Sequence, residues 1–145
     1  SFDGSSLDVQ KIYEEIVLPK RATSGSAGYD FYSPIDIVLK PKDFCLVPSG
    51  VRVWIDEGWV LKCYPRSSMG FKYHMSLMNT VGIIDSDYYN ADNEGHIMFK
   101  IYNGSDNVLE IKKGDRFVQG IFIPFGITVD DDSNSQRHGG FGSTN

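Results

Sequence analysis

The segment PSGVRVWIDEG (48–58) shows most clearly the pattern that predicts the fold of the whole chain. Val51, Val53 and Ile55 occupy alternate positions within it. A period of two places these side chains on one face of an extended backbone, as in a half-buried β-strand. The turn-forming residues PSG stand before this run and EG stands after it. The segment therefore predicts a short strand between two turns.

The same unit of apolar run and turn recurs along the chain. Breakers such as Pro41, Asn103-Gly104 and Lys113-Gly114 separate the runs. Turn signals at intervals of roughly 8–12 residues are typical of an all-β sandwich or barrel. Residues 67–73 alone favour a short helix. The strands that we expect are 12–17, 29–32, 35–39, 44–47, 51–55, 60–64, 81–84, 96–102, 108–111 and 117–123.

Length and composition point to one ordered domain. The chain has 145 residues, of which 41% are hydrophobic, enough for a buried core and too apolar for intrinsic disorder. We expect a single β domain over residues 1–129, then a polar linker and a glycine-rich arm over 130–145. No apolar run approaches the ~20 residues of a membrane-spanning helix, so no membrane partner is expected.

Charge and cysteine usage narrow the partners further. The net charge is −5 and the basic residues are scattered, whereas proteins that bind nucleic acid usually present a basic face. We therefore expect no nucleic-acid partner, while a small anion needs only a few cations in one pocket. Cys45 and Cys63 have no CxxC or Cys/His partners and are expected to be buried thiols in a reducing compartment. This favours the cytoplasm and leaves a nuclear or organellar location open.

The last nine residues, RHGGFGSTN (137–145), combine a cation, Arg137, with several glycines and one aromatic residue, Phe141. Glycine lets backbone N–H groups line up toward phosphate oxygens. An aromatic ring can close over a nucleobase, because every base offers a π-face. The composition predicts an arm that covers a nucleotide. The alternative is an ordinary C-terminal tail.

Two segments in the first half of the chain offer charged groups. In AGYDFYS (27–33), Asp30 lies between aromatic residues where a strand is expected, so it either pairs with a cation or belongs to a site. In YPRSSMG (64–70), a guanidinium and two hydroxyls follow a strand. They form a plausible phosphate cradle, although the same residues would also suit the first turn of a helix.

Two further segments carry candidates for catalysis. In NTVGIIDSDYY (79–89), an apolar run delivers Asp85 at its end. A carboxylate there can act as a general base toward water, or it can simply close a turn. In KKGDRFVQGIFIP (112–124), Gln119 interrupts an apolar strand. A buried amide needs partners, so it either joins two strands or orients a ligand or water.

In their order along the chain, these five segments resemble the five motifs of the homotrimeric dUTP pyrophosphatase (dUTPase) family. AGYDFYS resembles motif one, PRSSMG motif two, NTVGIIDSDYY motif three, GDRFVQG motif four and RHGGFGSTN motif five. The resemblance implies a jelly-roll-like β domain that assembles as a homotrimer. It also implies shared sites: motif three of one subunit meets motifs one, two and four of a second, and the arm of the third closes over them.

The activity that the resemblance implies is hydrolysis of dUTP to dUMP and pyrophosphate by attack of water on the α-phosphorus. This would limit uracil in DNA and supply dUMP for thymidylate synthesis. Asp85 would activate the water, and Gln119 would hold the water or Asp85. The implied phosphate contacts are Arg66, Ser67, Ser68 and Arg137.

The resemblance also implies how the nucleoside is recognised. Tyr88 would pack under the deoxyribose and leave no room for a 2′-hydroxyl, while Phe141 would stack on the uracil. A narrow hairpin slot would exclude thymine by its methyl group and cytosine by its reversed donor and acceptor pattern. The remaining implied contacts to the base or from the arm are Asn79, Gly82, Ile83, Ile84, Met98, Gly142 and Ser143.

A Mg²⁺ ion is implied as well, bound mainly by the phosphates and water, which suits its preference for few protein ligands. Asp30 would touch it through water. Two other functions stay open at this point. One is a dCTP deaminase-type enzyme of the same fold, and the other is a dUTPase-like nucleotide-sensing regulatory module.

The chain departs from the family pattern in three places. Ser68 stands where motif two usually has glycine. Residues 89–94 lengthen the hairpin after Tyr88, where the family usually has one residue before glycine. The arm is one residue short between Arg137 and Phe141, and it ends on Asn145 instead of glycine.

Overall fold

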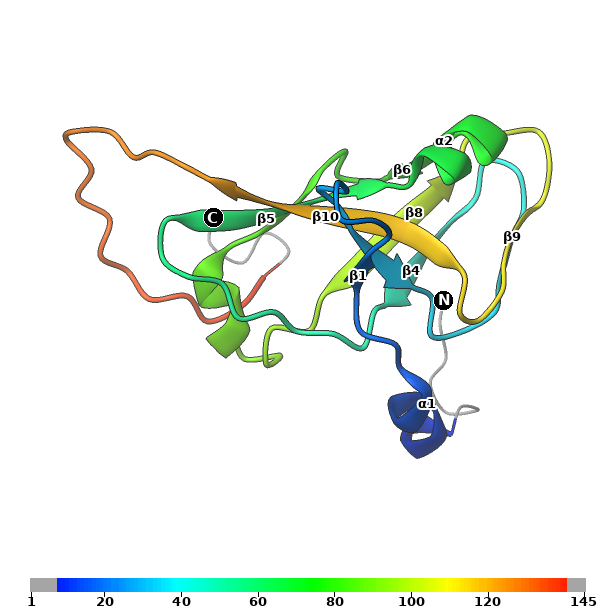
Figure 1. The fold of residues 1–145 in the computed structure, drawn as a ribbon, viewed down its shortest axis with the longest axis horizontal. Coiled ribbons are helices and arrows are strands. Elements are labelled where there is room, and N and C mark those ends of the chain that lie inside the picture. The colour runs from blue at the N-terminus through cyan, green and yellow to red at the C-terminus, as the bar shows by residue number, and fades with distance from the viewer. Residues whose placement is uncertain (1–7, 141–145) are drawn as a thin grey trace.

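The computed structural model describes residues 8–140 (Figure 1). This part of the chain consists mostly of short strands joined by turns, with two short α-helices and a 3₁₀ helix. The elements are α1 (Val9–Glu15), β1 (Lys20–Arg21), β2 (Tyr29–Tyr32), β3 (Ile37–Leu39), β4 (Phe44–Pro48), β5 (Trp59–Pro65), α2 (Ser67–Tyr73), β6 (Met75–Leu77), β7 (Gly82–Ile84), η2 (Ser86–Asn90), β8 (Met98–Asn103), β9 (Leu109–Ile111) and β10 (Arg116–Pro124).

The strands pair antiparallel in an order that differs from their order along the chain. One sheet has the order β1-β2-β10-β5-β7, a second has the order β4-β8-β6, and β3 pairs with β9. Strands distant in sequence therefore lie side by side, as β10 does between β2 and β5. The expected all-β, jelly-roll-like fold is present.

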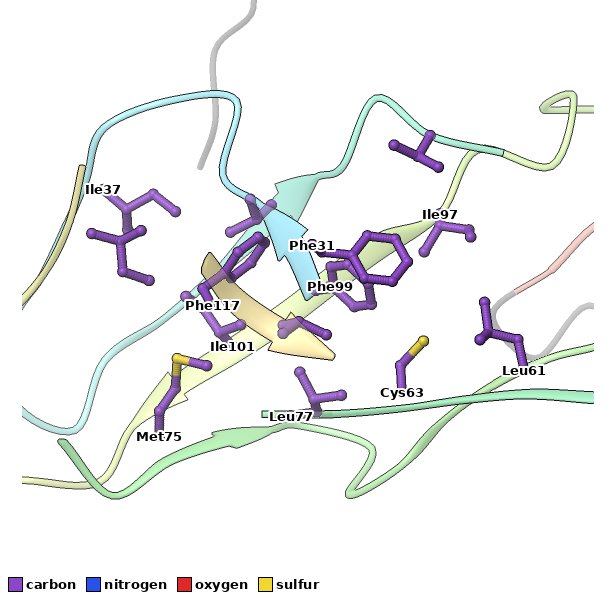
Figure 2. Packing of buried hydrophobic residues seen from close by; sticks show 14 of the residues in the cluster. Phe31, Ile37, Leu61, Cys63, Met75, Leu77, Ile97, Phe99, Ile101 and Phe117 are labelled. Atoms are coloured by element: carbon purple, nitrogen blue, oxygen red, sulfur yellow. The ribbon is translucent and has the colours of Figure 1, made fainter. Parts of the chain in front are cut away.

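The core lies where apolar side chains of the two larger sheets meet (Figure 2). Phe31 on β2 and Phe117 on β10 both contact Phe99 on β8, edge to face, with ring centroids 5.1 and 5.8 Å apart. All three rings are buried. Such pairs contribute about 0.5–1.5 kcal/mol each beyond the burial of their area. The aromatic contacts thus join the two sheets into one domain.

The prediction of a strand at residues 12–17 is wrong, because residues 12–15 belong to helix α1. Asp8 is the N-cap of α1, and its side chain accepts a hydrogen bond from the Lys11 amide at 3.1 Å. Within the helix, Gln10 donates to Glu14 one turn later at 3.1 Å. A capping aspartate and an i,i+4 pair stabilise a helix. These local signals outweigh the apolar residues of the segment.

The prediction of a strand at residues 51–55 is also wrong, because no regular strand forms there. The predicted alternation of buried and exposed side chains is nevertheless present. Val51 and Ile55 are buried and Trp54 is exposed. The Ile97 amide donates a backbone hydrogen bond to the Val51 carbonyl at 3.0 Å. The Val51 amide, however, donates to the Ser49 hydroxyl at 3.1 Å instead of to a neighbouring strand. A side chain that takes up a backbone donor competes with a strand ladder. The segment is therefore extended and half-buried without being paired as a strand.

The remaining expectations for secondary structure are confirmed. The helix at residues 67–73 is α2, and each other expected strand is present with its ends shifted by at most two residues. The elements β1, β6 and η2 were not expected.

Both cysteines are free thiols, as predicted, but only Cys63 is buried as expected, whereas Cys45 is partly buried. Burial raises the pKa of Cys63 to about 12. The pKa of Cys45 is raised by burial and by the nearby charge of Asp43. Neither thiol is activated as a nucleophile, because reactivity requires the thiolate.

Candidate functional site

A cleft of about 830 Å³ opens beside β7. In the described part of the chain, β7 is the last strand of its sheet and pairs with β5 alone. An edge strand presents backbone donors and acceptors on its outer side, which a ligand can use. The cleft thus sits where a planar group could be recognised by main-chain hydrogen bonds. The predicted site residues that line it are Asn79, Gly82, Ile83, Ile84, Asp85, Tyr88, Met98 and Arg137.

Two charged residues that line the cleft, Asp85 and Arg137, belong to one charge cluster. Asp85 follows β7 directly, and its side chain is about half exposed, at 47%. Arg137 donates from Nη2 to Oδ2 of Asp85 at 2.6 Å and from Nε to Oδ1 of Asp87 at 2.7 Å. The C-terminal segment therefore lies against the hairpin of its own chain. Hydrogen bonds between ionised groups are stronger than neutral ones, so this cluster fixes the orientation of the Asp85 carboxylate.

Tyr88 forms one wall of the cleft and is buried. Its hydroxyl donates to the His96 carbonyl at 2.5 Å and accepts from Nδ2 of Asn93 at 2.8 Å. Gly140 packs so closely on the ring that an added Cβ would lie 2.6 Å from a ring carbon. The Tyr88 ring is thus held at its hydroxyl and contacted by the C-terminal segment at Gly140.

His96 joins this hairpin to the half-buried segment described above. The Gly50 amide donates to Nε2 of His96 at 2.9 Å, which requires an unprotonated nitrogen. Burial lowers the pKa of His96. Both observations favour the neutral imidazole in the folded chain.

A second cluster is centred on Asp30 and includes the predicted phosphate contact Arg66. This buried carboxylate pairs with Nε of Arg66 at 3.1 Å and with Nη1 of Arg116 at 3.4 Å. Gln119 pairs with Asp30 across β10 and β2, and its side chain donates to the Pro65 carbonyl at 3.4 Å. Ser67 and Ser68 begin α2 beside Arg66. The cluster holds one guanidinium in place next to two hydroxyls.

The two clusters lie at opposite ends of β5. Ile84 pairs with Leu61, so Asp85 continues toward Val60, while Arg66 follows the other end of the strand, at Pro65. Val60 and Arg66 are six positions apart, and at ~3.3 Å per residue the separation is about 20 Å. Figure 1 agrees, with α2 at one end of the molecule and the red C-terminal segment at the other. One chain does not bring Asp85 and Arg66 to the same point.

Sequence reasoning missed several residues. Arg116 was not singled out as a site residue, yet it contacts Asp30. Asn93 was not considered, although the lengthened hairpin that contains it was noted. Cleft residues that were also missed are Leu46, Leu77, Met78, Val81, Phe99, Lys100 and Gly140.

Several predictions concern residues or groups that the structure does not describe. Phe141, Gly142 and Ser143 lie outside the described residues. Between residues 8 and 140, no group of three or more histidine, cysteine, aspartate or glutamate side chains is arranged to hold a metal ion. Over the same residues, every helix is too short or too polar to cross a membrane.

Comparison with known proteins gives one consistent family. The dUTPase family model matches residues 14–145. Deoxyuridine 5′-triphosphate nucleotidohydrolase of Lactococcus lactis subsp. lactis (strain IL1403) is 44% identical over 133 residues, which cover 89% of this chain and 88% of that protein.

Solved structures agree with the sequence matches. The crystal structure of dUTPase from Streptococcus mutans superposes with a TM-score of 0.70 at 41% identity, covering 77% of this chain and 88% of that one. A mutant dUTPase of phage phi11 of S. aureus, in which coordination of a structural Mg(II) ion was described, has a TM-score of 0.66 at 23% identity, covering 83% and 91%. The second likeness concerns the fold alone.

Proposed function

The chain belongs to the dUTPase family and hydrolyses dUTP to dUMP and pyrophosphate, and from this premise we propose how its residues divide the reaction. Asp85 is the general base, and it takes a proton from the water that attacks the α-phosphorus. The observation that carries this assignment is its position: a carboxylate that lines the cleft, directly after the edge strand β7 and before the wall formed by Tyr88. Positioning and charge stabilisation then supply the rest of the rate.

The nucleoside occupies the cleft. Uracil hydrogen-bonds to the outer edge of β7 near Ile83 and Ile84, with help from Asn79 and the backbone near Met98. Gly82 keeps the strand close to β5, since a Cβ there would lie 3.2 Å from that of Cys63. A cytosine would leave buried polar groups unpaired, and such mismatches are rejected by roughly 10⁴–10⁵-fold.

The triphosphate extends from the cleft toward cations. Arg66, Ser67 and Ser68 contact its oxygens, with Asp30 holding the Arg66 guanidinium in position, and Gln119 helps to hold the water. When nucleotide is present, Arg137 leaves the carboxylates that it contacts here and reaches the outer phosphates. Phe141, Gly142 and Ser143 of the arm then cover the base and phosphates.

The active assembly is a homotrimer with shared sites. Support comes from the separation of about 20 Å along β5, by the strand rise used above, between Asp85 and Arg66. A water held by Asp85 must lie within ~3–3.5 Å of the phosphorus that it attacks. Motif three of one subunit therefore faces the Arg66 cluster of a second, and the arm comes from the third.

Mg²⁺ fits the donors present when it arrives with the nucleotide. Both Asp30 oxygens already face guanidinium groups, so this carboxylate is placed to touch an ion through water rather than directly. Mg²⁺ commonly keeps several waters and few protein ligands. When bound, it neutralises charge on the phosphates.

The two other functions are less well supported. A dCTP deaminase-type activity is not favoured, because the family match and the relatives are dUTP hydrolases. A nucleotide-sensing module without activity would be expected to lack the base or the phosphate contacts, and Asp85 and Arg66 are both present.

The test is release of pyrophosphate from dUTP, dTTP, dCTP and UTP under identical conditions with Mg²⁺. We expect dUTP to be preferred strongly over the other three. Turnover of dTTP or dCTP comparable to that of dUTP would contradict the proposed recognition of the base. Release of ammonia from dCTP would point to the deaminase instead.

A further inference from the structure

The six residues 89–94, which lengthen the hairpin after Tyr88, were given no role in the reaction proposed above. We infer that this insertion immobilises the Tyr88 ring and that Asn93 within it is a positioning residue for the choice of deoxyribose over ribose. The inference rests on the proposed function, and it takes for Tyr88 the position beneath the deoxyribose that the family resemblance implies.

Asn93 binds the hydroxyl of Tyr88 directly. Its Nδ2 donates to the phenol oxygen at 2.8 Å, and that hydroxyl donates in turn to the His96 carbonyl at 2.5 Å. The Oδ1 of Asn93 accepts from the Gly95 amide at 3.2 Å. The far end of the ring is thus held from two directions, and the amide that holds it is itself fixed to the backbone.

The backbone around Asn93 leaves it little freedom. Glu94 and Gly95 have φ angles of 60° and 74°, and a Cβ on Gly95 would lie 2.7 Å from Cα of Tyr89 and 2.8 Å from the Tyr88 carbonyl oxygen. The backbone at Gly95, after the end of the insertion, therefore packs directly on the backbone of Tyr88 and Tyr89. Asn93 cannot shift without displacing the residues that carry the Tyr88 ring.

The outer side of the insertion is attached to the segment that precedes β5. Arg52 donates from Nη2 to the Tyr89 carbonyl at 2.6 Å, and its guanidinium lies 3.5 Å from the centroid of the Tyr89 ring. Trp54 meets the same ring edge to face at 5.2 Å. The insertion is therefore supported by the body of the domain.

To exclude UTP, which is larger than dUTP by one hydroxyl, the side chain beside the sugar must stay in position. A pocket that merely surrounds a substrate rejects an added hydroxyl only weakly, by roughly 10²-fold. Displacement of a side chain by about 1 Å is enough to change rates substantially. If the Tyr88 ring could swing away, the 2′-hydroxyl of UTP would fit beside it. The bond from Asn93 opposes that movement.

The test compares dUTP with UTP in Asn93→Leu, which keeps the size of the side chain and removes its hydrogen bonds. We expect the ratio of kcat/KM for dUTP to that for UTP to fall about tenfold, the effect of one lost hydrogen bond, while kcat for dUTP stays within about threefold. Asn90→Leu is the matched control, because Asn90 is an exposed residue of the same hairpin. It should keep the wild-type ratio.

A second variant separates positioning from general support of the fold. Tyr88→Phe keeps the ring but loses both hydrogen bonds of its hydroxyl, so it should lower the ratio to a similar extent. Asn93→Leu should then add nothing in the Tyr88→Phe background, because the atom on which Asn93 acts is gone. Tyr88→Phe alone still tests the inference if Asn93→Leu folds poorly, because it removes the hydroxyl and leaves Asn93 in place.

Three results would overturn the inference: an unchanged ratio in both single variants, equal losses on dUTP and UTP in Asn93→Leu, or full additivity in the double variant. A wild-type enzyme with no preference for dUTP over UTP would instead contradict the proposed function. The two failures are therefore distinguishable.

Discussion

At the scale of single residues, the candidate site is ordered by two charge clusters of opposite composition. One buried carboxylate, Asp30, lies between Arg66 and Arg116, whereas one cation, Arg137, lies between Asp85 and Asp87. The first cluster leaves an excess of positive charge and suits phosphate. The second leaves an excess of negative charge and suits proton abstraction from water. Opposite charge balance at the two positions is what hydrolysis of a phosphoanhydride requires.

Asp85→Asn should abolish most turnover while preserving the fold, because the amide has nearly the same shape but cannot accept a proton. A general base typically contributes roughly 10²–10⁴-fold. We expect kcat for dUTP to fall within that range, with binding of a non-hydrolysable dUTP analogue nearly unchanged in calorimetry. If the purified variant kept more than about a tenth of the wild-type rate, Asp85 would not be the base.

His96 should make stability depend on pH. Its pKa is lowered by burial in the folded chain, so the unfolded chain takes up the proton first as the pH falls. The neutral imidazole therefore contributes stability above the ordinary pKa of 6.5. That contribution is lost as the pH falls from this value through the lower folded value.

Urea unfolding at pH 7.5 and 5.5, at one protein concentration, measures this effect. The wild type should lose more stability between the two pH values than His96→Gln, whose amide can still accept from Gly50 and does not titrate. His74 and His138 are common to both proteins and cancel. An identical pH dependence would exclude a contribution from His96.

At the scale of elements, the sequence predicts a helix or strand correctly where the turn residues and the pattern of apolar residues indicate the same element. Helix α2 and the strands of the core were predictable because their turns and apolar residues point the same way. Helix α1 was mispredicted because the cap at Asp8 outweighs the apolar residues after it. The contact of Asp30 with Arg116 joins residues 86 positions apart, and pairing of that range depends on strand order, which no local pattern contains.

Deletion of residues 139–145 should slow hydrolysis at least tenfold without unfolding the domain, because a closing segment shields the reaction and completes the site. Residues 125–140 form no regular helix or strand, and nearly all of 125–136 are exposed, so the core does not depend on them. Steady-state kinetics and thermal unfolding of the truncated protein test this together. Wild-type kinetics after truncation would identify the arm as an ordinary tail.

At the scale of the whole molecule, the question is which chain supplies each part of a site. In this structure the C-terminal segment lies on the Asp85 of its own chain, whereas we propose that the arm serves another subunit of the trimer. Mixing two inactive proteins distinguishes these arrangements. One is Asp85→Ala with an intact arm, and the other keeps Asp85 but lacks residues 139–145.

Co-refolding the two at equal amounts should restore activity. In a cyclic trimer, about three quarters of randomly assembled molecules are mixed, and each has one site in three where an intact Asp85 meets an intact arm, so roughly a quarter of wild-type activity should return. If each arm serves its own chain, no site recovers. Native mass spectrometry must first confirm that mixed trimers are present. Their presence without recovered activity would refute shared sites.

The length of β5 has a consequence for how the enzyme responds to its own abundance. Because the strand keeps Asp85 and Arg66 apart, an isolated chain would hold only part of the shared site that we propose. Below the midpoint of assembly, the concentration of trimers falls as the third power of the chain concentration, since three chains must meet. The rate of dUTP hydrolysis would then rise steeply with the amount of protein made, and a low concentration of chains would leave the nucleotide pool almost unchanged.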